Sequence, residues 1–364
     1  MTEHNVYEYW LAGVPDMPGH VKVRIQETYP DLESFYHMSP AEIRQIMWLS
    51  DEQKQMLARA RPVNQIKGEF EQMDEQGVRM ITWRDPAYPH RFSIVHDAPY
   101  AIFLKGELPD PGLRSVAMVG ARACSPYGRR QAGQIARQLA KAGCCVVSGM
   151  ASGVDGIAQT AALKEGGQSL AVLGCGVCVC YPEHHLDLYR DLTARGGIIS
   201  EYPLHEPPIK FHFPQRNRLI SALADAVIVV EARVKSGSLI TADFALEQGR
   251  DVYAMPGPVD SPLSSGCHKL IEQGAKILFS PEQLIRDLGA GSASKAKTET
   301  TDGMPEGLSE TETVIFSQLS LTPVKLSQLE LMTGIDASLI ARTMMNLQLR
   351  GLVSELSRQC YIRT

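Results

Sequence analysis

The chain of 364 residues has no long hydrophobic run, and no stretch approaches the roughly 18 apolar residues that a membrane-spanning helix needs. Its first residues, MTEHNVYEYWLAG, have no basic segment ahead of an apolar one, so we predict no signal peptide. An excess of positive charge is also missing, because the formal net charge is -5. These absences favour a cytoplasmic protein without membrane insertion, in which any anion site is confined to part of the surface.

Several signatures of enzyme chemistry are missing as well. The turn at 120–122 reads GAR, where a dinucleotide site needs G-x-G-x-x-G. The segment CGVCVCYPEHH (175–185) holds three cysteines and two histidines, but no separated second ligand pair follows, as zinc ribbons require. We therefore predict no metal and interpret the cysteines as the continuation of a strand. No nucleophile, base and orienting residue occur as a series, so we expect a binding protein without a cofactor, and not an enzyme.

Hydrophobic spacing and composition divide the chain into four parts. Residues 1–75 have helical spacing and predict a small helical domain, and residues 76–288 alternate short apolar runs with helices. Residues 289–307, GAGSASKAKTETTDGMPEG, are small and polar and predict a flexible linker. Residues 308–364 predict helix, helix, turn, helix and a β-rich end, which resembles a winged helix. Its charges sum to zero, so protein contact or autoregulation is favoured over duplex DNA contact, which remains the alternative.

The middle part predicts an α/β fold with a doubly wound, Rossmann-like parallel sheet. Continuous Val, Ile and Leu runs separated by helices are typical of parallel strands that are covered on both faces. The runs are SVAMVG (115–120), CCVVSG (144–149), SLAVLG (169–174), GIISEY (197–202), AVIVVEA (226–232) and DVYAMPG (251–257). Because such sheets bind ligands beyond the carboxyl ends of their strands, we expect the functional residues in the loops after these runs.

Two basic islands stand out in this acidic chain. Residues 121–141 hold five basic residues and no acidic ones, and residues 207–218, PPIKFHFPQRNR, hold three basic residues and no acidic ones. Arg122 follows a strand and precedes a helix N-terminus, where a guanidinium and backbone N–H groups bind phosphate. The two islands predict one confined site for an anion.

The segment KFHFPQRNR combines aromatic rings with cations, which is typical of single-strand binding. A phenylalanine offers a stacking face to a base while Lys and Arg follow the backbone. Phe211 and Phe213 alternate, so we expect one to face the core and the other the groove, and we place Phe213 in the groove. Arg218 has the alternative role of a structural brace.

Loops of small residues follow other strands of the predicted sheet. SGMASGVDG (148–156) and SGSLIT (236–241) each precede a helix, and their amides and hydroxyls are suited to phosphate. The alternatives are helix packing for the first loop and simple N-caps for the second. We interpret Asp155 as a structural carboxylate.

Taken together, several motifs resemble the DprA/Smf family of DNA-processing proteins over roughly residues 104–284. They are VGAR, SGMASGVDGIAQTAAL, SEYP, FPQRNRLISAL, VVEARVKSGSLITADFALEQGR, YAMPGPVDSPLSSGCHKLI and EQGA. The resemblance implies an extended Rossmann fold between a helical SAM-like domain and a winged helix. It also implies a homodimer that binds single-stranded DNA and loads RecA recombinase onto incoming DNA during natural transformation. The usual VGSR is VGAR here, because Ala121 replaces a serine.

The resemblance places the DNA pocket on Arg122, Lys210, Phe213 and residues 216–218, with the glycine and serine loops around it. The predicted DNA-contacting residues are Gly120, Arg122, Ser148, Gly149, Gly174, Lys210, Phe213, Arg216, Asn217, Arg218, Ser236, Gly237, Ser238 and Thr241.

Two other functions remain as alternatives. A nucleotide phosphoribohydrolase on a related Rossmann fold carries PGGxGTxxE, where this chain has SGSLITADFALE. Hydrolysis of AMP-like substrates would favour it. A winged-helix transcription regulator that senses a small ligand would be favoured by specific retention of a duplex promoter fragment.

Overall fold

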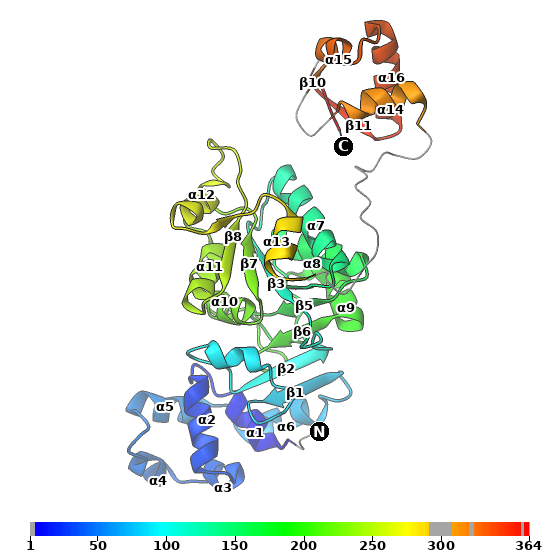
Figure 1. Cartoon of the computed structure of the whole chain (residues 1–364). Coiled ribbons are helices and arrows are strands. Elements are labelled where there is room, and N and C mark those ends of the chain that lie inside the picture. Colours follow the sequence, from blue (N-terminus) through cyan, green and yellow to red (C-terminus); the bar gives the residue numbers. More distant parts are fainter. Residues whose placement is uncertain (1–3, 291–307, 320–323, 358–359, 364) are drawn as a thin grey trace. The chain divides into compact units, whose positions relative to one another are not determined.

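The computed structural model describes residues 4–290, 308–319, 324–357 and 360–363 (Figure 1). The chain forms two compact units, Met1–Ser294 and Lys295–Thr364. Most of the predicted linker, residues 289–307, lies outside the described residues, and the domain boundaries inside the first unit stay predictions. Among the described residues, no helix combines the length and hydrophobicity that crossing a bilayer demands.

The first unit begins with short helices that pack around a shared core. They are α1 (Val6–Ala12), α2 (Gly19–Thr28), α3 (Leu32–Tyr36), α4 (Pro40–Gln45), α5 (Asp51–Arg59) and α6 (Val63–Glu71). Helices α1, α4 and α5 each start with a capping box, whose N-cap residues are Asn5, Ser39 and Ser50. These reciprocal bonds satisfy backbone N–H groups that would otherwise lack partners at the helix starts. Leu11 and Ile25 are fully buried between the helices.

A nine-stranded sheet forms the rest of this unit, in the order β1-β2-β6-β5-β4-β3-β7-β8-β9. The strands are β1 (Val78–Thr82), β2 (Ala101–Gly106), β3 (Ser115–Val119), β4 (Cys145–Ser148), β5 (Ser169–Val172), β6 (Gly197–Ser200), β7 (Ala226–Val229), β8 (Asp251–Ala254) and β9 (Lys276–Ile277). The strands from β3 to β9 pair in parallel, and β2 pairs antiparallel with both β1 and β6. All six predicted apolar runs contain strands, whereas β1, β2 and β9 were not predicted.

Both faces of the sheet are covered, which confirms the doubly wound prediction. In β3, Val116 and Met118 join one core cluster, while Ala117 and Val119 join another on the opposite face. The first face packs against α7 (Pro126–Lys141), α8 (Val154–Lys164) and α13 (Pro281–Asp287). The second face packs against the 3-10 helix η1 (His90–Ile94), α10 (His212–Ala222), α11 (Gly237–Glu247) and α12 (Ser265–Glu272). The 3-10 helix η2 (Glu183–His185) and α9 (Leu186–Arg195) precede β6.

The direction of the chain across the sheet reverses next to β3. From β3 the chain proceeds through β4 and β5 to β6 on one side, and then returns to β7 on the other side of β3. Loops that follow two such neighbouring strands separate in opposite directions and leave a crevice between them. The expected ligand site therefore lies where β3 and β7 end.

The cysteine-rich segment does not continue a strand, and that prediction was wrong. Strand β5 ends at Val172, and residues 173–182 form turns and bends. Cys178 Sγ donates a hydrogen bond to Gln76 Oε1 at 3.0 Å, so this loop is tied to the segment before β1. Among the described residues, no group of three or more His, Cys, Asp or Glu side chains is arranged to hold a metal ion.

The second unit contains three helices and a small sheet in its described part. Its elements are α14 (Glu310–Ser317), β10 (Val324–Lys325), α15 (Leu326–Thr333), α16 (Ala337–Leu349), β11 (Val353–Ser357) and β12 (Cys360–Arg363). The strands pair in the order β10-β12-β11, and Ile315, Leu329 and Met344 are fully buried in its core. Whether this unit is a winged helix in function as well as in element order stays a prediction.

Candidate nucleic-acid interface

A crevice of about 580 Å³ opens at the carboxyl ends of β3 and β7. Segments from five places in the sequence meet there, after β3, β4, β5, β6 and β7. The lining includes ten of the predicted residues: Gly120, Arg122, Lys210, Phe213, Arg216, Asn217, Ser236, Gly237, Ser238 and Thr241. The two basic islands of the sequence thus meet in one place, which is what a confined anion site requires.

Phe213 lies at the centre of this crevice, among cations and a second ring. The guanidinium carbons of Arg122 and Arg216 lie 5.7 and 5.9 Å from its ring centroid. The ring of Tyr181 lies 5.5 Å away at 37°. Guanidinium groups at this distance are attracted by the electrons of the ring. The arrangement fixes the orientation of Phe213 and surrounds an aromatic surface with positive charge.

Arg216 reaches the crevice from beneath and is almost entirely buried. Its Nη1 donates hydrogen bonds to the carbonyl oxygens of Gly149, at 3.2 Å, and of Val172. Asp155 is buried nearby and accepts a hydrogen bond from the Gly149 N–H at 3.0 Å. Burial raises the pKa of Asp155, although Arg216 and these hydrogen bonds oppose the rise. Asp155 therefore holds the β4 loop and balances a buried cation, in accord with a structural role.

Two of the predicted glycines stand behind the crevice and make room for its walls. A Cβ on Gly149 would lie 2.6 Å from Arg216 Nη2, and a Cβ on Gly174 would lie 2.9 Å from Phe213 Cδ1. Both distances are shorter than real Cβ contacts allow. Glycine at these positions therefore lets the guanidinium and the ring settle against the backbone.

Lys210 and Phe211 are neighbours in the sequence, but only Lys210 lines the crevice. Lys210 is exposed and lines the opening, and no ion pair holds it within the described residues. Phe211 is 63% exposed, so the prediction that one of the two phenylalanines faces the core was wrong. The reason is that α10 already begins at His212, with Phe211 as its N-cap, and strand alternation does not apply there.

The opposite wall comes from the start of α11. Ser236 is the N-cap, and its Oγ accepts a hydrogen bond from the Ser238 N–H at 3.4 Å. Thr241 is buried one turn further along the helix. Asn217 connects the two walls, because its Nδ2 donates to the Gly237 carbonyl at 3.3 Å. The serines thus act as N-caps while they line the crevice, and the helix start directs backbone N–H groups toward it.

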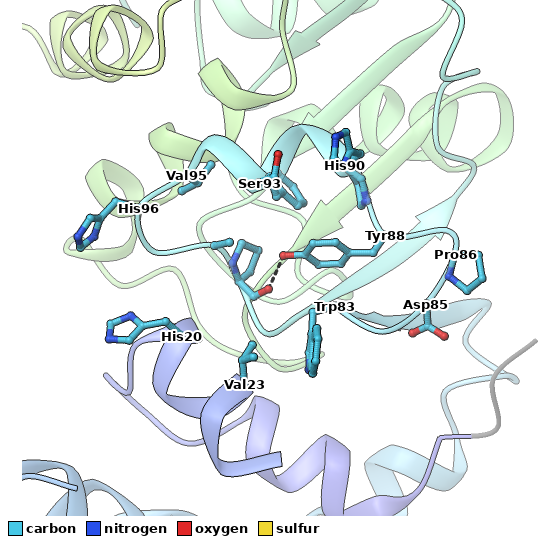
Figure 2. Close-up of a pocket in the computed structure, with 14 residues that line it drawn as sticks. His20, Val23, Trp83, Asp85, Pro86, Tyr88, His90, Ser93, Val95 and His96 are labelled. Atoms are coloured by element: carbon cyan, nitrogen blue, oxygen red, sulfur yellow. Dashed lines mark hydrogen bonds between the residues drawn. The ribbon is translucent and has the colours of Figure 1, made fainter. Parts of the chain in front are cut away.

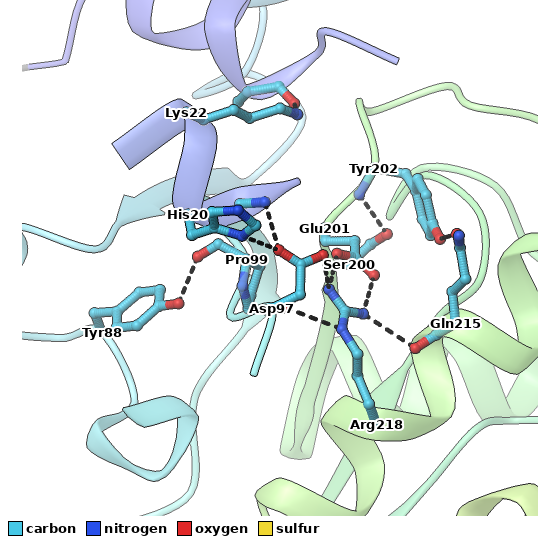
Figure 3. A network of polar contacts seen from close by, with 12 residues as sticks. His20, Lys22, Tyr88, Asp97, Pro99, Ser200, Glu201, Tyr202, Gln215 and Arg218 are labelled. Carbon is cyan, nitrogen blue, oxygen red and sulfur yellow. Dashed lines mark hydrogen bonds and ion pairs between the residues drawn. The ribbon is translucent and has the colours of Figure 1, made fainter. Parts of the chain in front are cut away.

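Besides Gly149 and Gly174, two more predicted residues, Ser148 and Arg218, are not part of this lining. Ser148 is fully buried, and its Oγ donates to the Met118 carbonyl at 2.6 Å, which ties β4 to β3. Arg218 points away from the crevice and forms two hydrogen bonds of 2.7 Å with the Glu201 carboxylate (Figure 3). Burial by itself lowers the pKa of Arg218, but Glu201 more than reverses this and the pKa is raised.

The Arg218 network joins the crevice helix to the N-terminal helices. Arg218 Nε donates to the Asp97 carbonyl at 3.1 Å, and Asp97 Oδ1 accepts from the Gly19 N–H at 2.7 Å (Figure 3). Gly19 is the first residue of α2. The network therefore connects α10 to α2 through a single intermediate residue.

A second cavity, of about 600 Å³, lies beside the same joint. His20 and Val23 of α2 face Trp83, Tyr88 and the loop that carries His90 and His96 (Figure 2). It is lined by aromatic and proline residues and holds no Lys or Arg. None of the predicted site residues lies in it.

Comparison with known proteins is consistent with this geometry. The family model "DNA recombination-mediator protein A" matches residues 79–289, which is more than half of the chain. The chain belongs to this family. The DprA/Smf resemblance read from the motifs is thereby confirmed.

DprA and Smf proteins are similar to this chain in both sequence and structure. Protein Smf of Escherichia coli is 45% identical over 205 residues, which cover 56% of this chain and 55% of that protein. The match thus spans about half the length of that relative. DprA of Streptococcus pneumoniae is 43% identical over 203 residues, which cover 56% of this chain and 72% of the relative.

Two solved DprA structures have the same fold. The Streptococcus pneumoniae structure gives a TM-score of 0.66 at 34% identity and covers 79% of this chain and 99% of that one. The Helicobacter pylori structure, which describes a single-stranded DNA binding mode for that protein, gives 0.52 at 32% identity and covers 58% and 95%.

In this DprA/Smf chain, the sequence arguments missed Tyr181 as a site residue. Tyr181 follows the cysteine-rich loop, lines the crevice and packs against Phe213. The signal was present in the sequence, because Tyr181 lies near the end of the loop that follows a predicted strand. The supposed strand continuation through the cysteines concealed it.

Proposed function

We propose that this crevice binds single-stranded DNA, with a base stacked on Phe213 and phosphates held by Arg122 and Lys210. The observation that carries the proposal is that the guanidinium carbons of Arg122 and Arg216 lie 5.7 and 5.9 Å from the Phe213 ring centroid, inside the crevice. Stacking of a base on an aromatic side chain contributes about 1–3 kcal/mol and tolerates any base, because every base has a π face. A single strand exposes its bases to such a ring, whereas a duplex keeps them stacked inside.

The walls of the crevice supply the electrostatic part of the binding. Arg122 and Lys210 are exposed cations at its opening, and the start of α11 directs N–H groups to it. Contacts of this kind follow phosphates without reading sequence. We therefore expect little base preference and a marked dependence of affinity on salt.

We further propose that the protein, as a homodimer, protects incoming DNA and loads RecA recombinase onto it during natural transformation. Family membership supports this role, as do the DNA-processing names of the relatives. The same reasoning makes it a cytoplasmic binding protein and not an enzyme. The part of the chain that contacts RecA is left open by this proposal.

Fluorescence anisotropy of a labelled oligo-dT and of a duplex of equal length tests the proposal. Wild type should prefer the single strand, and the Lys210→Ala/Phe213→Ala variant should lose that preference. Equal binding of both DNA forms by both proteins would contradict it. Hydrolysis of AMP by the pure protein, reduced in the same variant, would instead favour the phosphoribohydrolase alternative.

A further inference from the structure

Helix α7 exposes a row of cations that the crevice does not use. Of the first basic island only Arg122 lines the crevice, while Arg129, Arg130, Arg137 and Lys141 are exposed along α7. The helix contains no acidic residue. Within the described part of the chain, Lys141 is 3.5 Å from Glu165, and no ion pair is formed by the three arginines.

Three of these cations lie on one face of the helix. Arg137 and Lys141 follow Arg130 by 7 and 11 residues, so at 100° per residue each lies within about 20° of it around the axis. At 1.5 Å per residue they rise about 10 and 16 Å from it. We call Arg130, Arg137 and Lys141 the α7 basic stripe.

A row of charges of one sign is unusual on a helix face that is exposed only to solvent. Solvated helices normally mix both signs of charge at i,i+4 spacing, since such pairs stabilise the helix and like charges oppose it. Arg129 and Arg130 also lie close to the start of α7, where the helix dipole favours anions. No charge on the helix itself offsets this repulsion, so the face is arranged for an anion from outside the chain.

In the sequence, the stripe follows shortly after Arg122, which lines the proposed DNA crevice. Helix α7 begins at Pro126, four residues after Arg122, and its N-cap Ser125 is fixed by Glu231, whose carboxylate accepts hydrogen bonds from the Ser125 N–H and Oγ. Glu231 is buried and engaged in this way, so it leaves the exposed arginines uncompensated.

We propose that the α7 basic stripe binds the phosphates of the DNA strand where it continues beyond the crevice. This inference rests on the proposed function of the crevice. It implies that short oligonucleotides fill only the crevice, while longer ones gain contacts along α7. The regular spacing of the cations and their place in the sequence just after Arg122 favour a nucleic acid over an acidic protein.

The test compares two labelled oligo-dT lengths, about 6 and about 25 nucleotides, with wild type and Arg130→Gln/Arg137→Gln. Each lost single-strand phosphate contact lowers the slope of log K against log salt by about 0.7. Two lost contacts lower it by about 1.4 and weaken binding of the long oligonucleotide about 25-fold at about 0.1 M salt. Binding of the short oligonucleotide should not change.

Two control variants separate position from net charge. Arg44→Gln/Arg59→Gln removes the same charge from exposed positions on α4 and α5 and should leave both lengths unaffected. Arg130→Lys/Arg137→Lys keeps the charge and should bind the long oligonucleotide better than Arg130→Gln/Arg137→Gln does, because an ammonium group also binds phosphate as a point charge.

The outcomes separate this inference from the crevice proposal. If wild type fails to bind the short oligonucleotide, the crevice proposal fails and the stripe loses its basis. If the short oligonucleotide binds and the long one is equally tight with wild type and Arg130→Gln/Arg137→Gln, the stripe proposal alone is refuted. Binding of polyglutamate to wild type but not to that variant, with DNA affinity unchanged, would refute it in favour of an acidic protein partner.

Discussion

Replacement of Arg218 by methionine should destabilise the first unit strongly and leave the DNA crevice working. The side chains of Arg218 and Glu201 are 12% and 15% exposed and form a bidentate pair at 2.7 Å. Arg218→Met leaves the Glu201 carboxylate buried without its cation. Removal of one partner from a buried pair costs about 3–5 kcal/mol in the free energy of unfolding. Arg218→Met/Glu201→Leu removes both charges and should recover most of that loss.

Tryptophan fluorescence during urea unfolding measures this change in the free energy of unfolding of the first unit. All three tryptophans, Trp10, Trp48 and Trp83, lie in the first unit, so the second unit does not contribute to the signal. Anisotropy with oligo-dT, under conditions where the variant is folded, should give wild-type affinity. Two results together would refute the structural role of Arg218 and make it a DNA contact. The first is a decrease of less than about 1 kcal/mol in the free energy of unfolding of Arg218→Met, as is typical of exposed ion pairs. The second is clearly weaker DNA binding by this variant.

Three further outcomes follow from the contacts described above. Gly174→Ala places a methyl group 2.9 Å from the Phe213 ring, so affinity for oligo-dT in anisotropy should fall several-fold, and unchanged affinity would mean that the ring position is unimportant. The affinity of wild type for a long oligo-dT should decrease linearly in log K against log salt, and a flat line would contradict the phosphate contacts. Burial lowers the pKa of Lys22 to about 8, so the unfolded chain binds this proton more tightly and wild-type stability rises between about pH 8 and 10.5. Near pH 7, Lys22→Met should therefore unfold at a higher urea concentration than wild type. This gain in the free energy of unfolding is at most about 3 kcal/mol and should disappear above pH 10. A difference between the two proteins that does not depend on pH would refute the burial of a charge at Lys22.

The sheet was predictable from the sequence where its strands are buried on both faces. Runs such as AVIVVEA are continuous because each side of β7 meets a layer of helices. Strands β1 and β2 were not predicted, and they pair antiparallel with a register that comes from contacts far apart in the sequence, such as Phe103 with Ser200. The local sequence pattern does not indicate which strands pair over such a distance.

The residue types of the crevice were predictable, but the direction of each side chain was not. Once α10 is known to begin at His212, Phe213 and Arg216 fall within about 60° of each other around its axis. Arg218 falls about 160° from Arg216, on the far side of the helix, where Glu201 meets it. The sequence showed Phe213, Arg216 and Arg218 as neighbours, and their spacing around α10 determines which of them face the crevice.

Photo-crosslinking tests most directly whether a DNA base stacks on Phe213. An oligo-dT with a photoreactive thymidine analogue is bound to wild type, irradiated and digested with trypsin, and the modified residue is located by mass spectrometry. Cleavage after Lys210 and Arg216 releases Phe211–Arg216 as one peptide. An adduct is expected on Phe213, and an excess of unlabelled oligo-dT should suppress it. Adducts confined to residues outside the crevice, with Phe213 unmodified, would contradict it.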